Sequence, residues 1–366
     1  MGVVEGRGPS LVDVAVLAGV STQTVSRVSM GLDNVRPATR DRVLAAMAQL
    51  GYAPNTAARA LRYGSFRTIG MIAHGLARTG ESRTIEAVTE AARDEGYTVT
   101  LIDVENPSSD VVSAAATRLS HQAIDGLVIV RAETVTPDTL ALPSRLPVVV
   151  SDSRFVGHHP AVGADQVDGA RRATQHLLDL GHRTVHHVRG PAGSAPAQLR
   201  EESWRATLEA AGRPVPAVVP GDWTAASGYA AGRRMAHDPE VTAVFCANDE
   251  MAAGVLRALH EAGRAVPGDV SVVGFDDILL AEYLWPPLTT VVQDFGEIGR
   301  RLVARLLSEV RAGSSGTGTG TSGAAGSGAA GSGAGTGVDP DADDEDLHEV
   351  VPVELKVRQS TAPPRG

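Results

Sequence analysis

The chain has 366 residues, of which 43% are hydrophobic and 21% charged, so it is long enough for more than one domain with a sizeable core. Its net charge of −10 excludes a uniformly basic nucleic-acid-binding protein, and its single cysteine, Cys246, excludes a disulfide framework. The sequence has no apolar N-terminal run typical of export and no stretch that approaches a membrane span, so we expect a cytoplasmic protein without membrane contact.

The charge is unevenly distributed along the chain. Residues 1–66 carry seven arginines against four acidic residues, a local charge of +3, which leaves −13 for the remainder. A small basic head on an acidic body suits contact with phosphate by one end only. We therefore expect any nucleic-acid contact within this segment.

Residues 12–29 have the pattern of a helix, a tight turn and a second helix. Ser10 and Asp13 form a capping-box signature for the first helix, and Gly19 suits the left-handed position that ends it. Ser21 can cap the second helix. The predicted core residues are Val14, Leu17 and Ala18, then Val25 and Val28, and then Val43, Leu44, Met47 and Leu50 in a third helix that ends at Gly51.

The second helix leaves polar side chains on its outer face. Hydroxyls, an amide and a guanidinium are the groups that bind base edges and phosphates. Two amphipathic helices of an ordinary small domain are the alternative, and we favour a helix-turn-helix. The outward residues are Thr22, Gln23, Ser26 and Arg27. After Pro54, residues 55–62 predict a short helix that is too short to be stable alone and should order only when docked.

Beyond residue 66, apolar strands alternate with helical patterns, which indicates α/β architecture with parallel sheets covered on both faces. The pattern is too long for one sheet and favours two similar lobes with a cleft between them. The expected strands are 68–73, 98–104, 126–130, 147–151, 184–188, 243–246 and 270–274, and the expected helices are 84–95, 110–121, 169–180, 203–211, 250–262 and 295–310.

Polar residues follow several of these strands, and ligands of open parallel sheets bind at the carboxyl ends of strands. Carboxylates, amides and a guanidinium bond to hydroxyl pairs, while an indole covers the apolar face of a sugar ring. Asp276 could instead be a turn residue, and Trp223 could belong to the core. The candidate sugar-binding residues are Asp152, Arg200, Trp223, Asn248, Asp276 and Gln293.

The runs AGVSTQTVSRV, YAPNTAARALR, FCANDEMAAGVLRAL and VSVVGFDD resemble the LacI/GalR family of bacterial transcription regulators. GDWTAASGY and TTVVQDF resemble its lactose-repressor-type members in particular, and the resemblance covers residues 10–311 and 350–364. It implies two doubly wound, periplasmic-binding-protein-like lobes behind a small all-α helix-turn-helix domain. The chain should cross between the lobes near residues 166, 292 and 312–349.

The family resemblance also implies how the head binds double-stranded operator DNA. The second helix lies in the major groove, where Thr22 and Gln23 read bases, and two heads of a homodimer read a pseudo-palindrome. Leu61 matches a wedge that enters the minor groove. Met30, Val12 and Arg36 depart from the family pattern and put the base preference in doubt. The full set of implied DNA-binding residues is Ser21, Thr22, Gln23, Thr24, Ser26, Arg27, Asn55, Ala58, Leu61 and Arg62.

In lactose-repressor-like proteins, the positions that match the candidate sugar-binding residues contact the effector. The implied function is a repressor of carbohydrate-utilisation genes that a sugar or glycoside releases from its operator, with corepression by a non-sugar ligand left open. The opposite lobe carries Arg78, Glu81, Arg83 and Val130 where relatives have small apolar residues and an asparagine, so a different or charged sugar is a further alternative.

Two other classes of protein fit less well. A solute-binding protein would need an export signal. An enzyme is not expected, because the pairs His158-His159 and His186-His187 lack the helical metal spacing and no nucleophile-with-base or phosphate-loop motif appears. We expect neither a cofactor nor a metal.

The predicted domains are a DNA-binding domain (1–54), a hinge helix with linker (55–66) and an effector-binding and dimerisation domain (67–366). Within the last, residues 67–166 join 293–311 in one lobe, and 167–292 join 350–362 in the other. The insertion 312–349 is rich in Gly, Ser, Thr, Ala and acidic residues, and an inert flexible segment is favoured over an arm that competes with DNA. Residues 349–357 predict one strand in the second lobe. No tetramer-forming tail follows, so we expect a dimer.

Overall fold

The computed structural model describes residues 9–29, 34–52, 65–105, 108–130, 142–143, 146–151, 159–315 and 347–365. The chain divides into two compact units, which we call the head (residues 1–66) and the body (residues 67–366). Within these described ranges, no helix is both long and apolar enough to cross a membrane.

The head contains the three predicted helices, α1 (Leu11–Ala18), α2 (Thr22–Ser29) and α3 (Pro37–Leu50). The capping box is present: the Ser10 hydroxyl and the Asp13 carboxylate each bond the other's backbone N–H. Gly19 ends α1 in the left-handed conformation with φ 62°. These caps satisfy backbone groups that a short helix would otherwise leave unpaired.

The head core differs from the predicted one at two leucines. Leu17 and Leu44 are exposed, and Ala15 and Ala46 are buried in their place. These two alanines, and not the two predicted leucines, therefore contribute to the head core. The remaining predicted positions are buried, apart from Leu50, which is half-buried.

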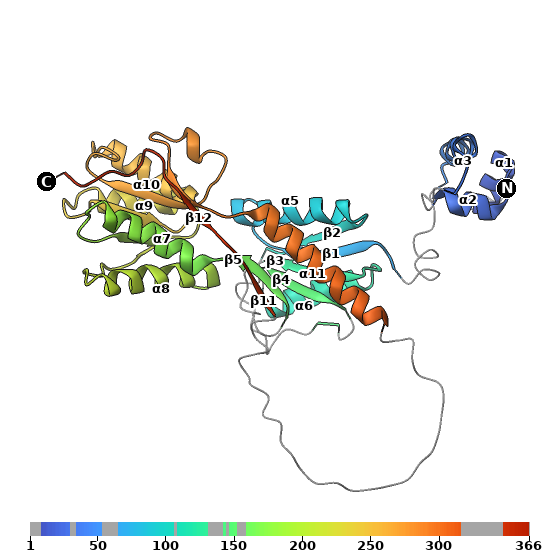
Figure 1. The fold of residues 1–366 in the computed structure, drawn as a ribbon, viewed down its shortest axis with the longest axis horizontal. Helices are drawn as coiled ribbons and strands as arrows, with labels where there is room; N and C mark the ends of the chain where they lie inside the picture. Colours follow the sequence, from blue (N-terminus) through green and yellow to red (C-terminus); the bar gives the residue numbers. More distant parts are fainter. Residues whose placement is uncertain are drawn as a thin grey trace, which may run out of the picture. The chain divides into compact units, whose positions relative to one another are not determined.

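The body contains two six-stranded sheets among its described residues (Figure 1). The first is entirely parallel, in the order β11-β5-β4-β3-β1-β2. Its strands are β1 (Thr68–Ala73), β2 (Thr98–Asp103), β3 (Gly126–Val130), β4 (Val148–Ser151), β5 (Ala161–Ala164) and β11 (His348–Val351).

The second sheet has the order β12-β10-β9-β8-β6-β7 and is parallel except for β12, which pairs antiparallel with β10. Its central strands are buried apolar runs, as expected where helices cover both faces. The strands of this second sheet are β6 (His186–Arg189), β7 (Val219–Pro220), β8 (Ala243–Cys246), β9 (Ser271–Asp276), β10 (Thr289–Val292) and β12 (Glu354–Lys356).

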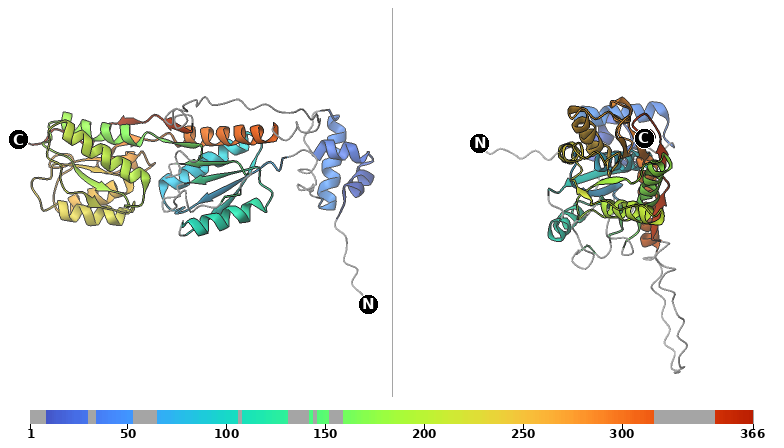
Figure 2. Two further views of the ribbon diagram at one scale, coloured as in Figure 1. Left: turned by 90° about the horizontal axis from the view of Figure 1, so that it is seen from below. Right: turned by 90° about the vertical axis from the view of Figure 1, so that its left-hand side faces the viewer.

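Helices cover both faces of each sheet, which defines two lobes (Figure 2). In the first lobe, α5 (Thr79–Asp94) and α11 (Phe295–Ser315) pack together on one face and α6 (Ser109–Ser120) on the other. In the second, α7 (Gln166–Asp179) and α8 (Ala195–Ala210) oppose α9 (Ala225–Met235) and α10 (Asp249–Glu261). The predicted doubly wound pair of lobes is confirmed.

One strand prediction was wrong. The segment 349–357 is not a single strand in the second lobe: β11 pairs with β5 in the first sheet, and β12 pairs with β10 in the second. The break lies at Pro352 and Val353, because proline has no N–H to donate to a ladder. The chain therefore crosses at these two residues, and the insertion that precedes them joins two elements of the first lobe.

Candidate functional site

The exposed face of α2 carries the predicted DNA-binding side chains of the head. Ser21, Thr22 and Gln23 are exposed. The Ser21 Oγ accepts a hydrogen bond from the Thr24 backbone N–H at 3.2 Å, so Ser21 caps the helix as predicted. Its capping bond fixes the N-terminal turn, whose side chains are the ones that a recognition helix directs at base edges. Three further predicted residues, Thr24, Ser26 and Arg27, are half-buried.

Several predicted site residues lie outside the described residues. They are Asn55, Ala58, Leu61, Arg62 and Asp152, and Met30, which departs from the family pattern, lies outside the described residues as well.

In the second lobe, the structure brings three predicted residues together around one that sequence analysis missed. The Arg200 Nε donates to the Gln166 Oε1 at 2.7 Å, and the Gln166 Nε2 donates to the Gln293 Oε1 at 3.3 Å. Gln293 in turn donates to the Asp276 Oδ1, which lies 3.6 Å from the Arg200 Nη2. We call these four buried residues, Gln166, Arg200, Asp276 and Gln293, the polar ring.

The polar ring is held from several elements. Gln166 begins α7, Arg200 lies in α8, Asp276 ends β9, and Gln293 joins β10 to α11. The Arg200 guanidinium also donates to the Ala247 carbonyl and lies 3.6 Å from the centroid of the Phe275 ring. A cation that is taken out of water is stable only with such a full set of partners.

Backbone strain is concentrated beside the polar ring. Asp276 has φ 112°, Asp277 has φ 50°, and Trp223 has φ 73°. Non-glycine residues rarely adopt these conformations, which cost about 1–3 kcal/mol each and cluster at functional sites. The two predicted site residues Asp276 and Trp223 therefore occupy positions whose geometry the fold maintains at a cost.

Trp223 and Asn248 form a second part of the site. The Asn248 Nδ2 donates to the Trp223 carbonyl at 3.0 Å, and the Asn248 Oδ1 caps α10 by accepting from the Met251 N–H at 3.0 Å. The Trp223 ring packs against Gly190, where a Cβ would lie 2.5 Å from it. Among the described residues, the buried Trp223 Nε1 has no hydrogen-bond partner, so it is a donor that an acceptor oxygen of a ligand would satisfy.

Asp249 has a structural role. It is fully buried, and its carboxylate accepts bonds from the Ile278 N–H at 2.9 Å and the Thr290 hydroxyl at 2.6 Å. Burial, together with the charge of Asp276, raises its pKa well above the usual value. Through these two hydrogen bonds, Asp249 links the strained segment that follows β9 to strand β10.

The first lobe reaches the second through the N-terminal turns of α5. The Thr79 hydroxyl donates to the Glu250 carboxylate, and the Arg83 Nη1 donates to the Asp277 carbonyl at 3.1 Å. The Asp277 carboxylate is held in turn by Arg358 at 2.6 Å and Lys356 at 3.2 Å. The start of α5 therefore contacts the second lobe at the residue after Asp276 and at Glu250, whose carboxylate bonds the Asn248 amide that holds the Trp223 loop (residues 221–224, between β7 and α9).

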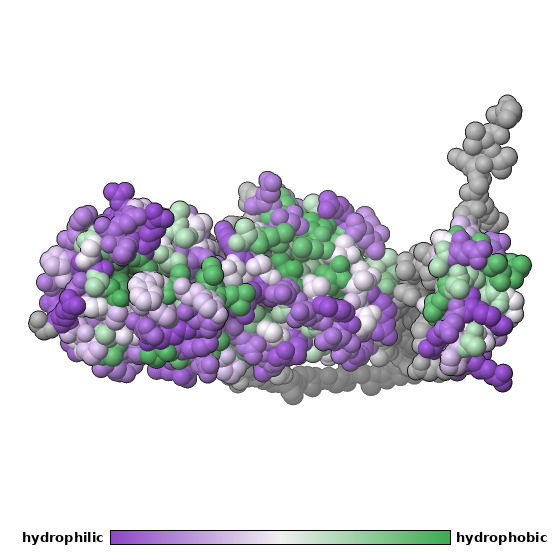
Figure 3. Space-filling view, turned by 90° about the horizontal axis from the view of Figure 1, so that it is seen from above, coloured by the Kyte–Doolittle hydropathy of each residue, from purple (hydrophilic) through white to green (hydrophobic). Residues whose placement is uncertain are grey.

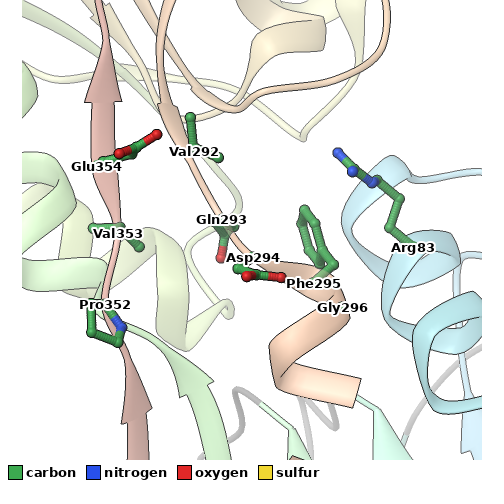
Figure 4. A pocket seen from close by; sticks show the side chains of 9 residues that line it. All are labelled: Arg83, Val292, Gln293, Asp294, Phe295, Gly296, Pro352, Val353 and Glu354. Atoms are coloured by element: carbon green, nitrogen blue, oxygen red, sulfur yellow. The ribbon is translucent and has the colours of Figure 1, made fainter. Parts of the chain in front are cut away.

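A cavity of about 470 Å³ lies beside the two chain crossings that follow β10 and β11 (Figure 4). Arg83 of α5 faces it from the first lobe. Gln293 is the one predicted effector-binding residue in its lining. The lining residues are Arg83, Val292, Gln293, Asp294, Phe295, Gly296, Pro352, Val353 and Glu354.

Two potentially reactive side chains belong to the core. Cys246 is fully buried, and burial raises the pKa of its thiol. His187 is stacked between Trp204 and Phe245, with ring centroids 5.2 and 4.8 Å away, and burial lowers its pKa to about 3. Both are packing residues.

The fold and these sites define a helix-turn-helix head joined to a body of the periplasmic-binding-protein type. Residues 10–55 match the family model described as bacterial regulatory proteins, lacI family, and residues 174–320 match that of the periplasmic binding protein-like domain.

Relatives match most of the chain. The ribose operon repressor of Escherichia coli (strain K12) is 35% identical over 304 residues, 81% of this chain and 92% of that protein. The lactose operon repressor of the same strain is 36% identical over 302 residues, 81% of this chain and 84% of that protein. A crystal structure of the Lac repressor dimer bound to operator and the anti-inducer ONPF has a TM-score of 0.78 at 30% identity, covering 97% of this chain and 100% of that one.

The chain belongs to the lacI family of bacterial regulatory proteins, and the predicted family is confirmed. These relatives are repressors and not enzymes, in agreement with the sequence analysis.

Proposed function

We propose that this protein is a transcriptional repressor that binds a pseudo-palindromic operator through its head and is released when a sugar or glycoside binds between the lobes of its body. The observation that carries the proposal is the combination, in one chain, of an exposed polar face on α2 with the polar ring and Trp223. The similarity to the ribose operon and lactose operon repressors supports it.

In the head, α2 lies in the major groove. Thr22 and Gln23 bind base edges, and Ser21, Thr24, Ser26 and Arg27 hold phosphates or bases. Asn55, Ala58, Leu61 and Arg62 complete the DNA contact as the hinge segment orders on the duplex. The exposure of Thr22 and Gln23 and the capped start of α2 support these roles.

In the body, the effector stacks on Trp223 and bonds to the polar groups around it. The Trp223 Nε1 donor supports this role, since nothing else among the described residues pairs with it. Arg200, Asn248, Asp276, Gln293 and Asp152 supply the remaining polar contacts. Effector binding favours one arrangement of the lobes, and its differential affinity for the two arrangements limits how far operator binding can shift.

The repressor acts as a homodimer in the cytoplasm, where bacterial DNA lies. A dimer is supported by the similarity to the operator-bound Lac repressor dimer and by a run of exposed apolar residues that includes Leu280, Tyr283 and Trp285, the last with 90% of its surface accessible. Hydrophobic residues also gather on the face of the first lobe seen in Figure 3. The exposed large apolar side chains of that lobe include Leu76, Leu101 and Val111.

The test starts with a selection of DNA duplexes that bind the full-length protein. Each duplex carries a random core of about 20 base pairs, which is the length of two half-sites. The selected duplex is then titrated in the presence of monosaccharides, disaccharides and nucleobases. We expect a pseudo-palindrome and one sugar class that weakens binding. A sugar that strengthened binding would replace induction by corepression, and a nucleobase that alone acted would overturn the sugar assignment.

The matched variant is Trp223→Phe, which keeps an aromatic ring but removes the indole N–H. We expect operator affinity to be unchanged and the effector concentration for half release to rise several-fold, the value of one hydrogen bond of about 1 kcal/mol. An unchanged effector response in Trp223→Phe would show that the Trp223 Nε1 does not donate to the effector.

A further inference from the structure

The charged side chains around the proposed effector site are already paired. In the second lobe, Arg200 Nη2 lies 3.6 Å from Asp276 Oδ1, and both side chains are buried. In the first lobe, Arg78 Nη1 lies 3.6 Å from Glu81 Oε1, and the Glu81 side chain is only 1% exposed. Each arginine is therefore already paired with a carboxylate of the protein before any ligand binds.

Contacts across the lobes place Arg78 near the Trp223 loop. Its chain neighbour Thr79 donates to the Glu250 carboxylate, which also accepts from the Asn248 Nδ2 at 2.8 Å. The same Asn248 amide bonds to the Trp223 carbonyl. The residue next to Arg78 is thus joined to the Trp223 loop through one carboxylate and one amide.

The electrostatics of the same loop agree. The pKa of Asp222, which precedes Trp223, is lowered first by the Thr224 hydroxyl and also by the positive charge of Arg78. The Arg78 side chain itself lies over Gly75, where a Cβ would be 3.2 Å from the arginine Cδ. Its guanidinium therefore lies beside Glu81 at the junction of the lobes, close enough for its charge to act on Asp222.

Arg83, the second arginine near the start of α5, has different partners. The Arg83 Nη1 donates to the Asp277 carbonyl, and its guanidinium lies 4.9 Å from the centroid of the Phe295 ring. It faces the cavity beside the chain crossings. Four carboxylates take part in these contacts beside Arg78 and Arg200: Glu81, Asp222, Glu250 and Asp276.

We propose that Glu81, by neutralising Arg78, and Asp276, by neutralising Arg200, restrict the effector to an uncharged polyhydroxylated ligand and reject sugar acids and sugar phosphates. The inference rests on the proposed function and names the chemical class that its site accepts. It excludes the charged sugar that Arg78 and Arg83 of the first lobe leave open in the sequence analysis.

The physical reason is competition for the same guanidinium groups. An anionic ligand that bound Arg78 would have to displace Glu81, whose buried carboxylate would lose its ion pair with Arg78 without gaining water, and breaking the ion pair of a buried charge is costly. The ligand would also meet Asp222 and Glu250. A hydroxyl does not force this exchange, because it donates to a carboxylate oxygen and accepts an arginine N–H while the ion pair stays intact.

Glu81 is the residue on which the restriction depends most. It lies in the first turn of α5, where the positive end of the helix dipole favours a negative charge. An amide there would leave both the dipole and Arg78 available to an anion. The variant Glu81→Gln should therefore bind anionic sugars that the wild type rejects. A merely structural role for Glu81 would not produce this gain.

The experiment measures binding by the full-length protein with neutral probes and their anionic counterparts: D-glucose, D-glucuronate and D-glucose 6-phosphate, and the galactose equivalents. Thermal shift and operator release are both recorded. The wild type should respond to a neutral member of a set and at least tenfold more weakly to its acid or phosphate. Glu81→Gln should bring the affinities for the charged members to within a few-fold of the neutral one.

The control is Glu86→Gln, the same change at an exposed position of the same helix, which should leave the preference as in the wild type. Should Glu81→Gln fail to fold, Asp222→Asn at an exposed residue should move the preference in the same direction by a smaller factor. Wild-type binding of a uronate or sugar phosphate as tight as that of its neutral parent, or a folded Glu81→Gln with no gain, would overturn the inference alone. Failure of every sugar, charged or neutral, would instead overturn the proposed function.

Discussion

Arg200 and Asp276 form an ion pair in which the two side chains keep 1% and 6% of their surface exposed, with Nη2 and Oδ1 3.6 Å apart. A charge buried this deeply cannot be rehydrated when its partner is removed. The loss of one partner therefore costs more than the pair itself contributes. The pair belongs both to the proposed effector site and to the structural support of the second lobe.

We accordingly expect Arg200→Met to lower the free energy of unfolding by about 3–5 kcal/mol, the usual cost of breaking a buried pair. Urea unfolding of the full-length protein measures it. The control is Arg183→Met, which removes an exposed pair with Glu240 and should change stability little. Equal effects of the two substitutions would show that the polar ring does not stabilise the lobe.

His187 should make the protein sensitive to mild acid. Its pKa in the folded chain is about 3, below the ordinary value of 6.5, because the folded state buries it as the neutral form. Below pH 6.5 the unfolded chain binds a proton that the folded chain does not, so stability falls as pH falls, by up to about 1.4 kcal/mol per pH unit.

The check is urea unfolding of wild type and His187→Phe at several pH values between 6.5 and the range where carboxyl groups titrate. The variant should lose this part of the acid sensitivity, whereas His121→Phe at an exposed position should keep it. If the free energies of unfolding of wild type and His187→Phe depended on pH in the same way, His187 would not be the source of the acid sensitivity.

Two substitutions on α2 should affect operator binding in different ways. Gln23→Ala should cost about 1–3 kcal/mol with the preferred operator and relax the preference at one base pair. Arg27→Ala should weaken all duplexes alike and reduce the slope of log affinity against log salt by about 1. Binding is measured against single-base variants of the selected operator at several salt concentrations.

The control for these variants is Gln49→Ala, an exposed amide near the end of α3 that should change neither quantity. A base preference that survives Gln23→Ala unaltered would assign the reading of that base pair to another residue.

The apolar run before Pro286 should be a contact between subunits. Trp285→Asp places a charge where the exposed indole is expected to be buried by a second copy, so we expect dissociation to monomers and weaker operator binding. Analytical ultracentrifugation at micromolar concentration measures the mass. Val167→Asp, at an exposed position of α7, should remain dimeric. Leu280→Asp provides a second variant, and dimers in both would place the interface elsewhere.

Strong apolar patterns predict the fold well. The sequence predicts β8 residue for residue, because its four buried apolar residues follow the polar Thr242 and end one residue short of the Asn248-Asp249 pair. It misses α9, whose helical pattern is diluted by Gly228 and Gly232. Those glycines are needed there because a Cβ at Gly228 would lie 2.1 Å from the Met251 carbonyl oxygen of the neighbouring α10. Tertiary packing, which local propensity does not contain, decides this element.

The candidate site is predicted less completely than the fold. Residues at the ends of strands, such as Asp276 and Asn248, carry a local signal that survives in the structure. Gln166 carries none, because an amide at the start of a helix is an ordinary surface residue until α8 and the segment after β10 are brought to it. The displacement from Leu17 to Ala15 in the head core has the same origin, since only the neighbouring helix decides which face of α1 is buried.

The crossing at Pro352 and Val353 has a consequence for the insertion between α11 and β11. Both elements belong to the first lobe, so the two attachment points of the insertion are carried by the same lobe. A rotation of one lobe against the other leaves the distance between these points unchanged. Lengthening or shortening the insertion should therefore leave the equilibrium between lobe arrangements where it is, and evolution is free to vary this segment independently of the switch.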